Sequence, residues 1–225
     1  MIRTMKKLTI AILFLLFTGQ LFAQNARYGN YGFKLGLTAH PNFGFIKVEN
    51  GKGNGVSLGF SYGLIGDFNF AENYSFTTGL TVTTINGKST ELTPAFTIPG
   101  SVAPNGYDIK YKMQYLEVPL TIKLKTTEVN GVKWYGQFGL SNDFRLGSKL
   151  DIANGSTTIS NNIDGGDYTN FYRAGMIIGG GGEFSIASKT SLMAGLTYNN
   201  GFTNLTSGDN KVRNHYVGLS FGVFF

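Results

Sequence analysis

Two histidines, His40 and His215, are the side chains of this sequence best suited to move protons at neutral pH. A histidine beside Ser, Asp or Glu could cleave a lipid or a peptide. The chain has no Cys, which excludes a Cys nucleophile, a disulfide framework and a Cys-ligated metal. Two imidazoles alone do not make a metal site, so we expect no metal and no cofactor.

Two short segments resemble binding loops only weakly. The run from Gly179 to Gly182 lacks the Lys-Ser/Thr and the strand-to-helix context of a phosphate loop. We expect it to allow curvature and close packing in a strand. The segment Asp164-Gly165-Gly166-Asp167 hints at calcium but lacks the spaced ligands of a calcium loop.

The remaining chemistry belongs to charged side chains that share one strand face with Gly, Ser and Thr. Both signs are present, and ions removed from water need partners or cost several kcal/mol each. We predict that they form a salt-bridged network inside a barrel; a narrow polar conduit or a ligand cleft is the alternative. The set is Lys34, Asp67, Glu117, Lys123, Lys133, Asp143, Arg145, Arg173 and Glu183.

The composition indicates that these residues are carried by β-strands. The 225 residues include 32 Gly, 19 Phe and 12 Tyr, and only 14 % are charged, against about 25 % in average proteins. A disordered chain would have fewer aromatic residues, and a helical bundle would not tolerate so much Gly. A β protein rich in Gly and aromatic residues remains.

The N-terminus has the pattern of a secretory signal peptide at residues 1–23, followed by one domain at 24–225. Arg3, Lys6 and Lys7 precede a short apolar run that ends at Ala23 and falls short of the ~20 residues of a spanning helix. Without these three basic residues, the formal net charge falls from +6 to +3. With no basic cluster left, we expect no nucleic-acid partner.

Period-2 alternation predicts strands throughout the rest of the chain. Between Val56 and Phe70, even positions are large and mostly apolar, and odd positions are mostly small or polar. The expected strands are residues 33–45, 56–70, 74–86, 107–125, 132–146, 168–186, 192–202 and 212–225. In the fourth strand the apolar face changes from odd to even positions near Tyr115, which predicts a β-bulge there.

The connections predict an eight-stranded antiparallel up-and-down transmembrane β-barrel in the outer membrane. Tight turns alternate with longer polar loops at about 46–55, 87–106, 147–167 and 203–211, as in such barrels. Both termini would then be periplasmic. A soluble barrel with the apolar face inside is the alternative, but so narrow an interior suits the small residues better.

Aromatic residues near the strand ends predict two girdles at the membrane interfaces. On the turn side they are Phe33, Phe68, Phe70, Tyr74, Trp134, Phe184 and Phe225, and on the loop side Phe43, Phe45, Phe144, Tyr172 and Phe202. Eight strands leave no porin-sized channel. Alternation also places His40 inward and His215 outward, so we expect no enzyme active site.

Two stretches carry a family resemblance. The last strand alternates up to Phe225, which resembles the signal by which the barrel assembly machinery recognises its clients. The stretch Tyr115-Leu116-Glu117-Val118-Pro119-Leu120 resembles the PorT-like outer-membrane β-barrel family of Bacteroidetes-type bacteria. The resemblance implies an outer-membrane barrel and, for PorT itself, an accessory role in protein secretion.

We therefore expect an integral outer-membrane protein with a structural or interaction role. Outer-membrane lipid would surround its barrel, and the outer loops would contact an envelope protein. An accessory component of a secretion system and a rim enzyme acting on lipid or peptide are the alternatives.

Overall fold

The computed structural model describes residues 32–94 and 105–225, so the expected signal peptide at 1–23 lies outside the described residues. Residues 33–225 form one compact unit. None of the described residues belongs to a helix long and apolar enough to cross a membrane.

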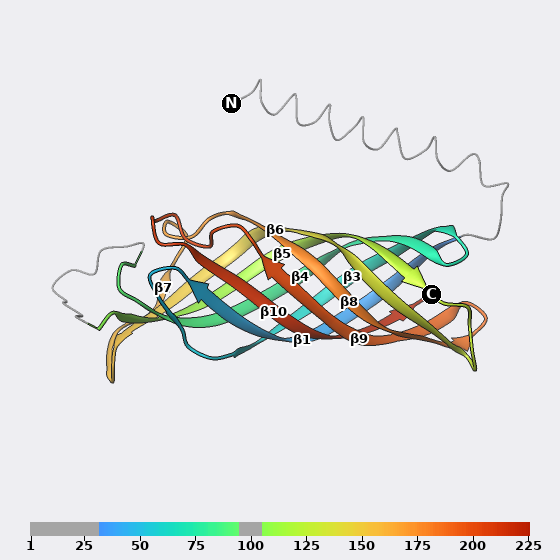
Figure 1. The fold of residues 1–225 in the computed structure, drawn as a ribbon, viewed down its shortest axis with the longest axis horizontal. Helices are drawn as coiled ribbons and strands as arrows, with labels where there is room; N and C mark the ends of the chain where they lie inside the picture. Colours follow the sequence, from blue (N-terminus) through green and yellow to red (C-terminus); the bar gives the residue numbers. More distant parts are fainter. Residues whose placement is uncertain (1–31, 95–104) are drawn as a thin grey trace, which may run out of the picture. The chain divides into compact units, whose positions relative to one another are not determined.

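Eight long strands close into an antiparallel barrel, as the sequence predicted (Figure 1). Each strand pairs with the next long strand, and the last long strand, β10, pairs with β1. Two short strands, β2 and β7, pair antiparallel with the C-terminal parts of β4 and β6. The strands are β1 (Phe33–Val48), β2 (Gly51–Gly53), β3 (Ser57–Ala71), β4 (Tyr74–Glu91), β5 (Tyr107–Lys125), β6 (Val132–Asn154), β7 (Thr157–Asp164), β8 (Tyr172–Ala187), β9 (Thr190–Gly201) and β10 (Val212–Phe224).

The two ends of the barrel differ as expected. At one end, here called the turn end, short connections at 72–73, 126–131 and 188–189 join the strands. At the other, the loop end, the strands run further than predicted. Much of the expected loops 46–55, 87–106 and 147–167 is strand, with β4 reaching Glu91 and β6 reaching Asn154. Polar outward residues such as Lys149 and Asp151 hid these extensions from the sequence pattern.

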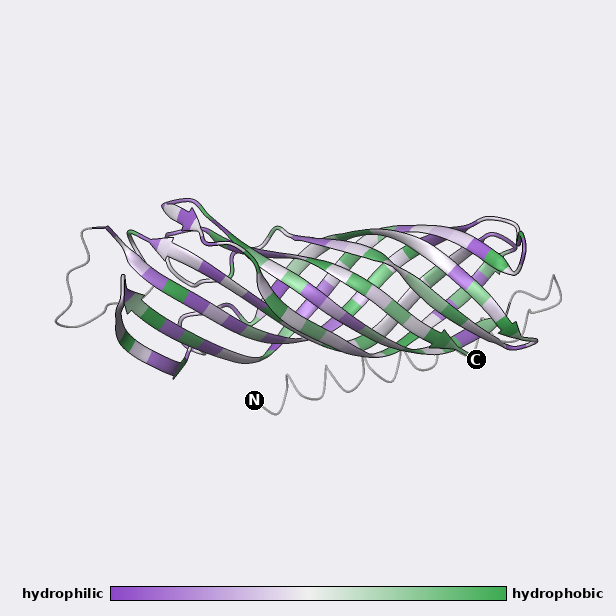
Figure 2. Cartoon of the chain, turned by 90° about the horizontal axis from the view of Figure 1, so that it is seen from below, coloured by the Kyte–Doolittle hydropathy of each residue, from purple (hydrophilic) through white to green (hydrophobic). Residues whose placement is uncertain are grey.

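The outer surface of the barrel carries the large apolar side chains of the alternating pattern. Figure 2 shows hydrophobic and hydrophilic residues alternating in bands along the strands. Leu58, Phe60, Tyr62 and Leu64 of β3 are all exposed. Aromatic rings pack against one another near both ends, with Phe33 and Phe68 4.7 Å apart at the turn end and Phe144 and Tyr172 5.6 Å apart nearer the loop end. A barrel with this surface is suited to lipid.

The predicted change of the inward face in the strand 107–125, which is β5, is wrong. Residues at odd positions of β5 point inward along its whole length, from Tyr107 to Lys123. A register shift does occur at Gln114 and Tyr115, but the extra residue is Leu146, in the neighbouring strand β6. The apolar residues change from the inner to the outer face of β5 near Tyr115, while the backbone keeps its phase.

The interior consequently has two zones. Toward the loop end, inward side chains form an apolar core that the sequence did not predict, and we call the part of the barrel around this core the cap. Its members are Ile46, Ile85, Tyr107, Ile109, Tyr111, Met113, Tyr115, Leu150, Ile152, Leu205, Val212 and Tyr216. Toward the turn end the inward side chains are polar and charged. We call that zone the lumen.

Candidate functional site: the charged lumen

At the turn end, the lumen holds two buried acids between two lysines. Lys123 Nζ lies 2.7 Å from Asp67 Oδ2 and 3.4 Å from Glu183 Oε1. Lys125 approaches the same two oxygen atoms at 3.1 and 3.4 Å. Thr77 donates a further hydrogen bond of 2.6 Å to Asp67. Four charges of balanced sign therefore neutralise one another inside the barrel.

Aromatic rings complete the surroundings of Lys123. Its Nζ lies 5.1 Å from the ring centroid of Tyr135 and 4.9 Å from that of Phe224. Both distances are within the range of a cation–π contact. The ammonium group is thus held by carboxylates and ring faces from four different strands, which fixes it in place.

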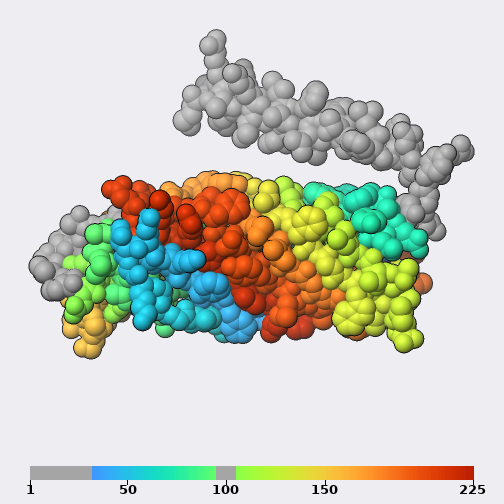
Figure 3. Space-filling model, viewed as in Figure 1, coloured from blue at the N-terminus to red at the C-terminus, as the bar shows by residue number. Residues whose placement is uncertain are grey.

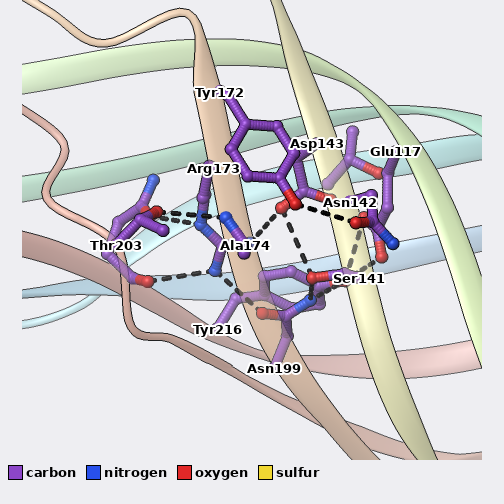
Figure 4. A network of polar contacts seen from close by, with 12 residues as sticks. Glu117, Ser141, Asn142, Asp143, Tyr172, Arg173, Ala174, Asn199, Thr203 and Tyr216 are labelled. Atoms are coloured by element: carbon purple, nitrogen blue, oxygen red, sulfur yellow. Dashed lines mark hydrogen bonds and ion pairs between the residues drawn. The ribbon is translucent and has the colours of Figure 1, made fainter.

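A second cluster of polar contacts surrounds Arg173 (Figure 4). The Arg173 guanidinium forms an ion pair with Asp143, its register neighbour on β6. It also donates hydrogen bonds to the side-chain oxygens of Asn199, at 2.8 Å, and Asn214, at 2.5 Å. The buried guanidinium therefore donates to side chains on three different strands.

Glu117 joins this cluster through neutral groups. The Tyr216 hydroxyl donates to the Glu117 carboxylate, with distances of 3.0 and 3.1 Å to its two oxygens. The Asn199 amide donates to Ser141 at 2.9 Å and points toward Tyr216 at 3.4 Å. Tyr216 also belongs to the cap core, so it connects the two zones of the interior.

Between the two clusters lies a cavity of about 60 Å³, bordered by His40, Glu117 and Lys123 among other residues. At about 30 Å³ per water in the liquid, it has room for very few water molecules. The apolar core of the cap fills the barrel beyond it. This arrangement suits a filled, rigid barrel and gives no support to the predicted alternative of a conduit or ligand cleft.

The cap contains one polar centre of its own, at Glu91. Its carboxylate accepts hydrogen bonds from Tyr111 at 2.7 Å, Ser89 at 2.8 Å and Asn210 at 3.2 Å. Burial raises the pKa of Glu91 above its usual value, while the three hydrogen bonds oppose that change. Asn210 also accepts from the backbone N–H of Asn50, so the centre ties the β9–β10 loop to the ends of β4 and β1.

Six of the nine predicted lumen charges belong to the two clusters, and three do not. Lys34 lies opposite Asp67 near the turn end without a hydrogen bond or ion pair to a described residue. Lys133 lies 3.9 Å from Glu128 at the same end. Arg145 instead holds the loop after β7, donating to the carbonyl of Gly166 at 2.7 Å and to the hydroxyl of Thr169 at 2.6 Å.

The sequence prediction missed several members of the network. Lys125 continues the inward set of β5 and could have been found by extending the alternation. Asn199, Asn214 and Tyr216 are polar or aromatic residues with no charge to mark them. Glu91 lay in a segment predicted to be a loop.

The two histidines diverge, as alternation predicted. His40 borders the lumen cavity and hydrogen-bonds with Thr38. His215 stacks on Phe45, with ring centroids 5.3 Å apart, and neither of its ring nitrogens has a hydrogen-bond partner among the described residues. Within residues 32–94 and 105–225, neither histidine forms a hydrogen bond with a Ser, Asp or Glu side chain.

The two weak binding motifs have structural roles. A Cβ on Gly181 would lie 2.2 Å from the carbonyl oxygen of Ala194, so the strands pack closely at this Gly-rich segment. Asp164 accepts a hydrogen bond of 2.9 Å from the backbone of Gly166, which closes a local turn. Across residues 32–94 and 105–225, no group of three or more His, Asp or Glu side chains is placed to hold a metal ion.

Comparison with known proteins identifies a family. A family model described as "Outer membrane protein beta-barrel domain" matches residues 22–207. No curated protein sequence matches the chain.

Solved structures similar to this chain are outer-membrane barrels of low sequence identity. Neisserial surface protein A is 14 % identical, with a TM-score of 0.46, covering 86 % of this chain and 97 % of its own. The outer membrane protein OprG from Pseudomonas aeruginosa is 13 % identical, with a TM-score of 0.43, covering 86 % and 95 %. Ail, the attachment invasion locus protein of Yersinia pestis, is 14 % identical, with a TM-score of 0.39, covering 85 % and 98 %.

Proposed function

Because the chain belongs to the family of outer membrane protein β-barrel domains, we propose that its barrel anchors the cap in the outer membrane and presents it to another envelope protein. The barrel supplies the anchor, and the cap supplies a rigid surface above the lipid. The role is structural or adhesive and needs no catalytic residue.

The construction of the cap is the observation that carries this proposal. At the loop end, β5 turns Lys110 and Lys112 outward and Tyr111 and Met113 inward. This arrangement is that of a water-soluble protein, with an apolar core and a polar surface. A barrel that merely crossed the membrane would need no such extension, whereas a contact surface gains from being held rigidly away from the lipid.

The orientation of the barrel forms part of the proposal. With both termini in the periplasm, after export by a cleaved signal at 1–23, the cap faces the outside of the cell. Phe225, at the turn end, donates its backbone N–H to the carbonyl of Leu35 at 2.9 Å and leaves its ring exposed. An exposed terminal aromatic residue at this position suits recognition by the barrel assembly machinery during insertion.

Site-specific photocrosslinking in intact cells tests the partner role. Leu92 and Val56 are exposed apolar side chains at the loop end, and Lys189 is exposed in a turn at the other end. A photoreactive residue at position 92 or 56 should capture a discrete envelope protein, and the same residue at position 189 should not. Capture at neither loop-end position, or the same product from both ends, would contradict the proposal.

An accessory role in secretion is a finer form of the same proposal, based on the PorT-like resemblance. The stretch that carries the resemblance crosses from the cap to the lumen, with Tyr115 and Glu117 buried and Leu116 between them. Its residues thus serve the construction of the barrel. The identity of the captured protein decides the question, because a secretion accessory should yield components of an export machine.

A further inference from the structure

Two cations face each other on the outer surface of the barrel, where its first and last strands meet. Lys47 of β1 and Arg213 of β10 are direct register partners, and both are exposed. Cβ atoms of directly opposite residues lie about 4.5–5.5 Å apart, and like charges in such pairs are destabilising. The loop ends of the two strands lie side by side, blue beside red, in Figure 3.

Neighbouring acids do not neutralise this pair. Among the described residues, neither Lys47 nor Arg213 forms a salt bridge. The nearby Glu49 is instead 3.5 Å from a third cation, Lys211. On another part of the cap surface, by contrast, Lys112 has its own carboxylate, Asp151, at 2.7 Å.

A hollow of about 240 Å³ lies over the pair, bordered by Lys47, Val48, Glu49, Lys211 and Arg213. Three cations and one carboxylate give its border a net charge of +2. At about 30 Å³ per liquid water, the hollow is large enough for an anion. Its charge and size indicate an anionic ligand.

The rows below the pair place the hollow at the edge of the lipid-facing surface. Moving from Lys47 toward the turn end, the next outward row is Phe45 opposite His215, and the row after that is Phe43 opposite Val217. The surface changes from aliphatic and aromatic to cationic within three rows. Cations at such an edge reach the headgroup level of a bilayer.

We propose that Lys47 and Arg213 bind the phosphate monoester headgroup of a membrane lipid whose acyl chains lie along the β1–β10 seam. Arg213 supplies a planar, bidentate donor and Lys47 a point charge, a combination suited to phosphate. The bound phosphate removes the repulsion between the two side chains. The inference rests on the placement of the barrel in a membrane and requires no protein partner.

Lipid binding to the full-length mature protein in a neutral detergent, followed by native mass spectrometry, tests the site. The probes are phosphatidic acid, which carries a phosphate monoester, phosphatidylcholine, which does not, and inorganic phosphate. The wild-type protein should retain phosphatidic acid in preference to phosphatidylcholine. The double variant Lys47→Gln, Arg213→Gln should bind phosphatidic acid roughly tenfold more weakly or worse, because two charge-assisted contacts are lost.

Lys189→Gln, which removes one exposed charge at the turn end, is the matched control and should bind phosphatidic acid as the wild type does. Heat-modifiable mobility in detergent gels checks that each barrel is folded; the single variants replace the double variant if it does not fold. If the double variant Lys47→Gln, Arg213→Gln binds phosphatidic acid as tightly as the wild type, the proposal is overturned. Inorganic phosphate that binds as tightly as the lipid overturns the lipid as ligand. Absence of photocrosslinks at positions 92 and 56 would contradict the proposed partner role and would leave the lipid site unaffected.

Discussion

Tyr111 in the cap and Lys123 in the lumen point inward from the same strand, β5, yet their surroundings are opposite. Tyr111 lies among Ile, Leu and Met side chains, and Lys123 lies between carboxylates. On the outside the contrast reverses, with the partly exposed Lys112 beside the cap and the exposed Leu124 beside the lumen. The two regions share one backbone and differ in which face carries the apolar side chains.

The difference shows what stabilises each zone. In the proposed placement water surrounds the cap, so burial of apolar side chains drives its packing. In the same placement lipid surrounds the lumen and offers no such driving force, because lipid tails are as apolar as the side chains themselves. Ion pairs and hydrogen bonds must therefore hold the inside of the lumen together. Substitutions in the lumen and in the cap should separate these two kinds of stabilisation.

Removal of the Arg173 charge should have the largest effect. In Arg173→Met, Asp143 stays buried without its partner, and we expect a loss of about 3–5 kcal/mol in the free energy of unfolding. Urea unfolding of the barrel reconstituted in lipid vesicles measures it. The double variant Arg173→Met, Asp143→Asn should recover much of the loss. A double variant no more stable than Arg173→Met would show that the ion pair does not control the stability of the lumen.

Truncation of a side chain in the cap core should cause the second-largest loss in the free energy of unfolding. Leu150 is fully buried, and Leu150→Ala should cost about 2–5 kcal/mol through lost burial and the cavity that remains. The same vesicle assay gives the value. Leu92→Ala, at an exposed position of the loop end, should change stability by no more than about 0.5 kcal/mol. Equal losses at the two positions would mean that the cap has no core of the kind described.

Lowering the pH should stabilise the folded cap. Because burial raises the folded-state pKa of Glu91, the folded protein binds a proton more readily than the unfolded chain does. This contribution is fully present below the usual pKa of 4.5 and is lost as the pH rises through the folded value. Amide hydrogen exchange in the cap, measured from acidic to neutral pH, should show protection falling across that window. In Glu91→Gln, the protection of the cap amides should change less with pH. In Glu49→Gln, at the exposed outer surface, protection should depend on pH as in the wild type.

The surface ion pair of the cap should matter least. Lys112 and Asp151 are partly exposed, so Lys112→Ala should cost between about 0 and 1 kcal/mol in low salt and less in high salt. Urea unfolding at two salt concentrations measures the difference. A loss comparable to that of Arg173→Met would mean that an ion pair on the outside of the cap stabilises the protein as much as one inside the lumen.

The eight strands and the two kinds of connection were predictable because large apolar residues alternate with small or polar ones along much of each strand. The loop-end extensions were not, since Lys149, Leu150, Asp151 and Ile152 follow an alternation in which the polar face has moved to the outside. The switch of apolar residues at Tyr115 is visible in the sequence, but it does not reveal that β5 keeps its backbone phase there.

The charged network was predictable as a set of residues and not as a set of contacts. Alternation identifies Asp143 and Arg173 as inward, but their pairing depends on the register of β6 against β8. The division into two clusters depends further on the height of each residue along the barrel. Uncharged members such as Asn199 and Tyr216 become visible only when the buried donors and acceptors are matched.

The seam between β1 and β10 has a consequence for the time course of folding. It joins Gly36 to Phe224 and Thr38 to Phe221, so nearly the whole chain must be present before it can form. Contacts of such large sequence separation form slowly, and until they do, β1 and β10 expose unpaired backbone groups. Closure of this seam should therefore be the slowest step of assembly, and a nascent barrel should be most open to helpers and to misassociation just before it.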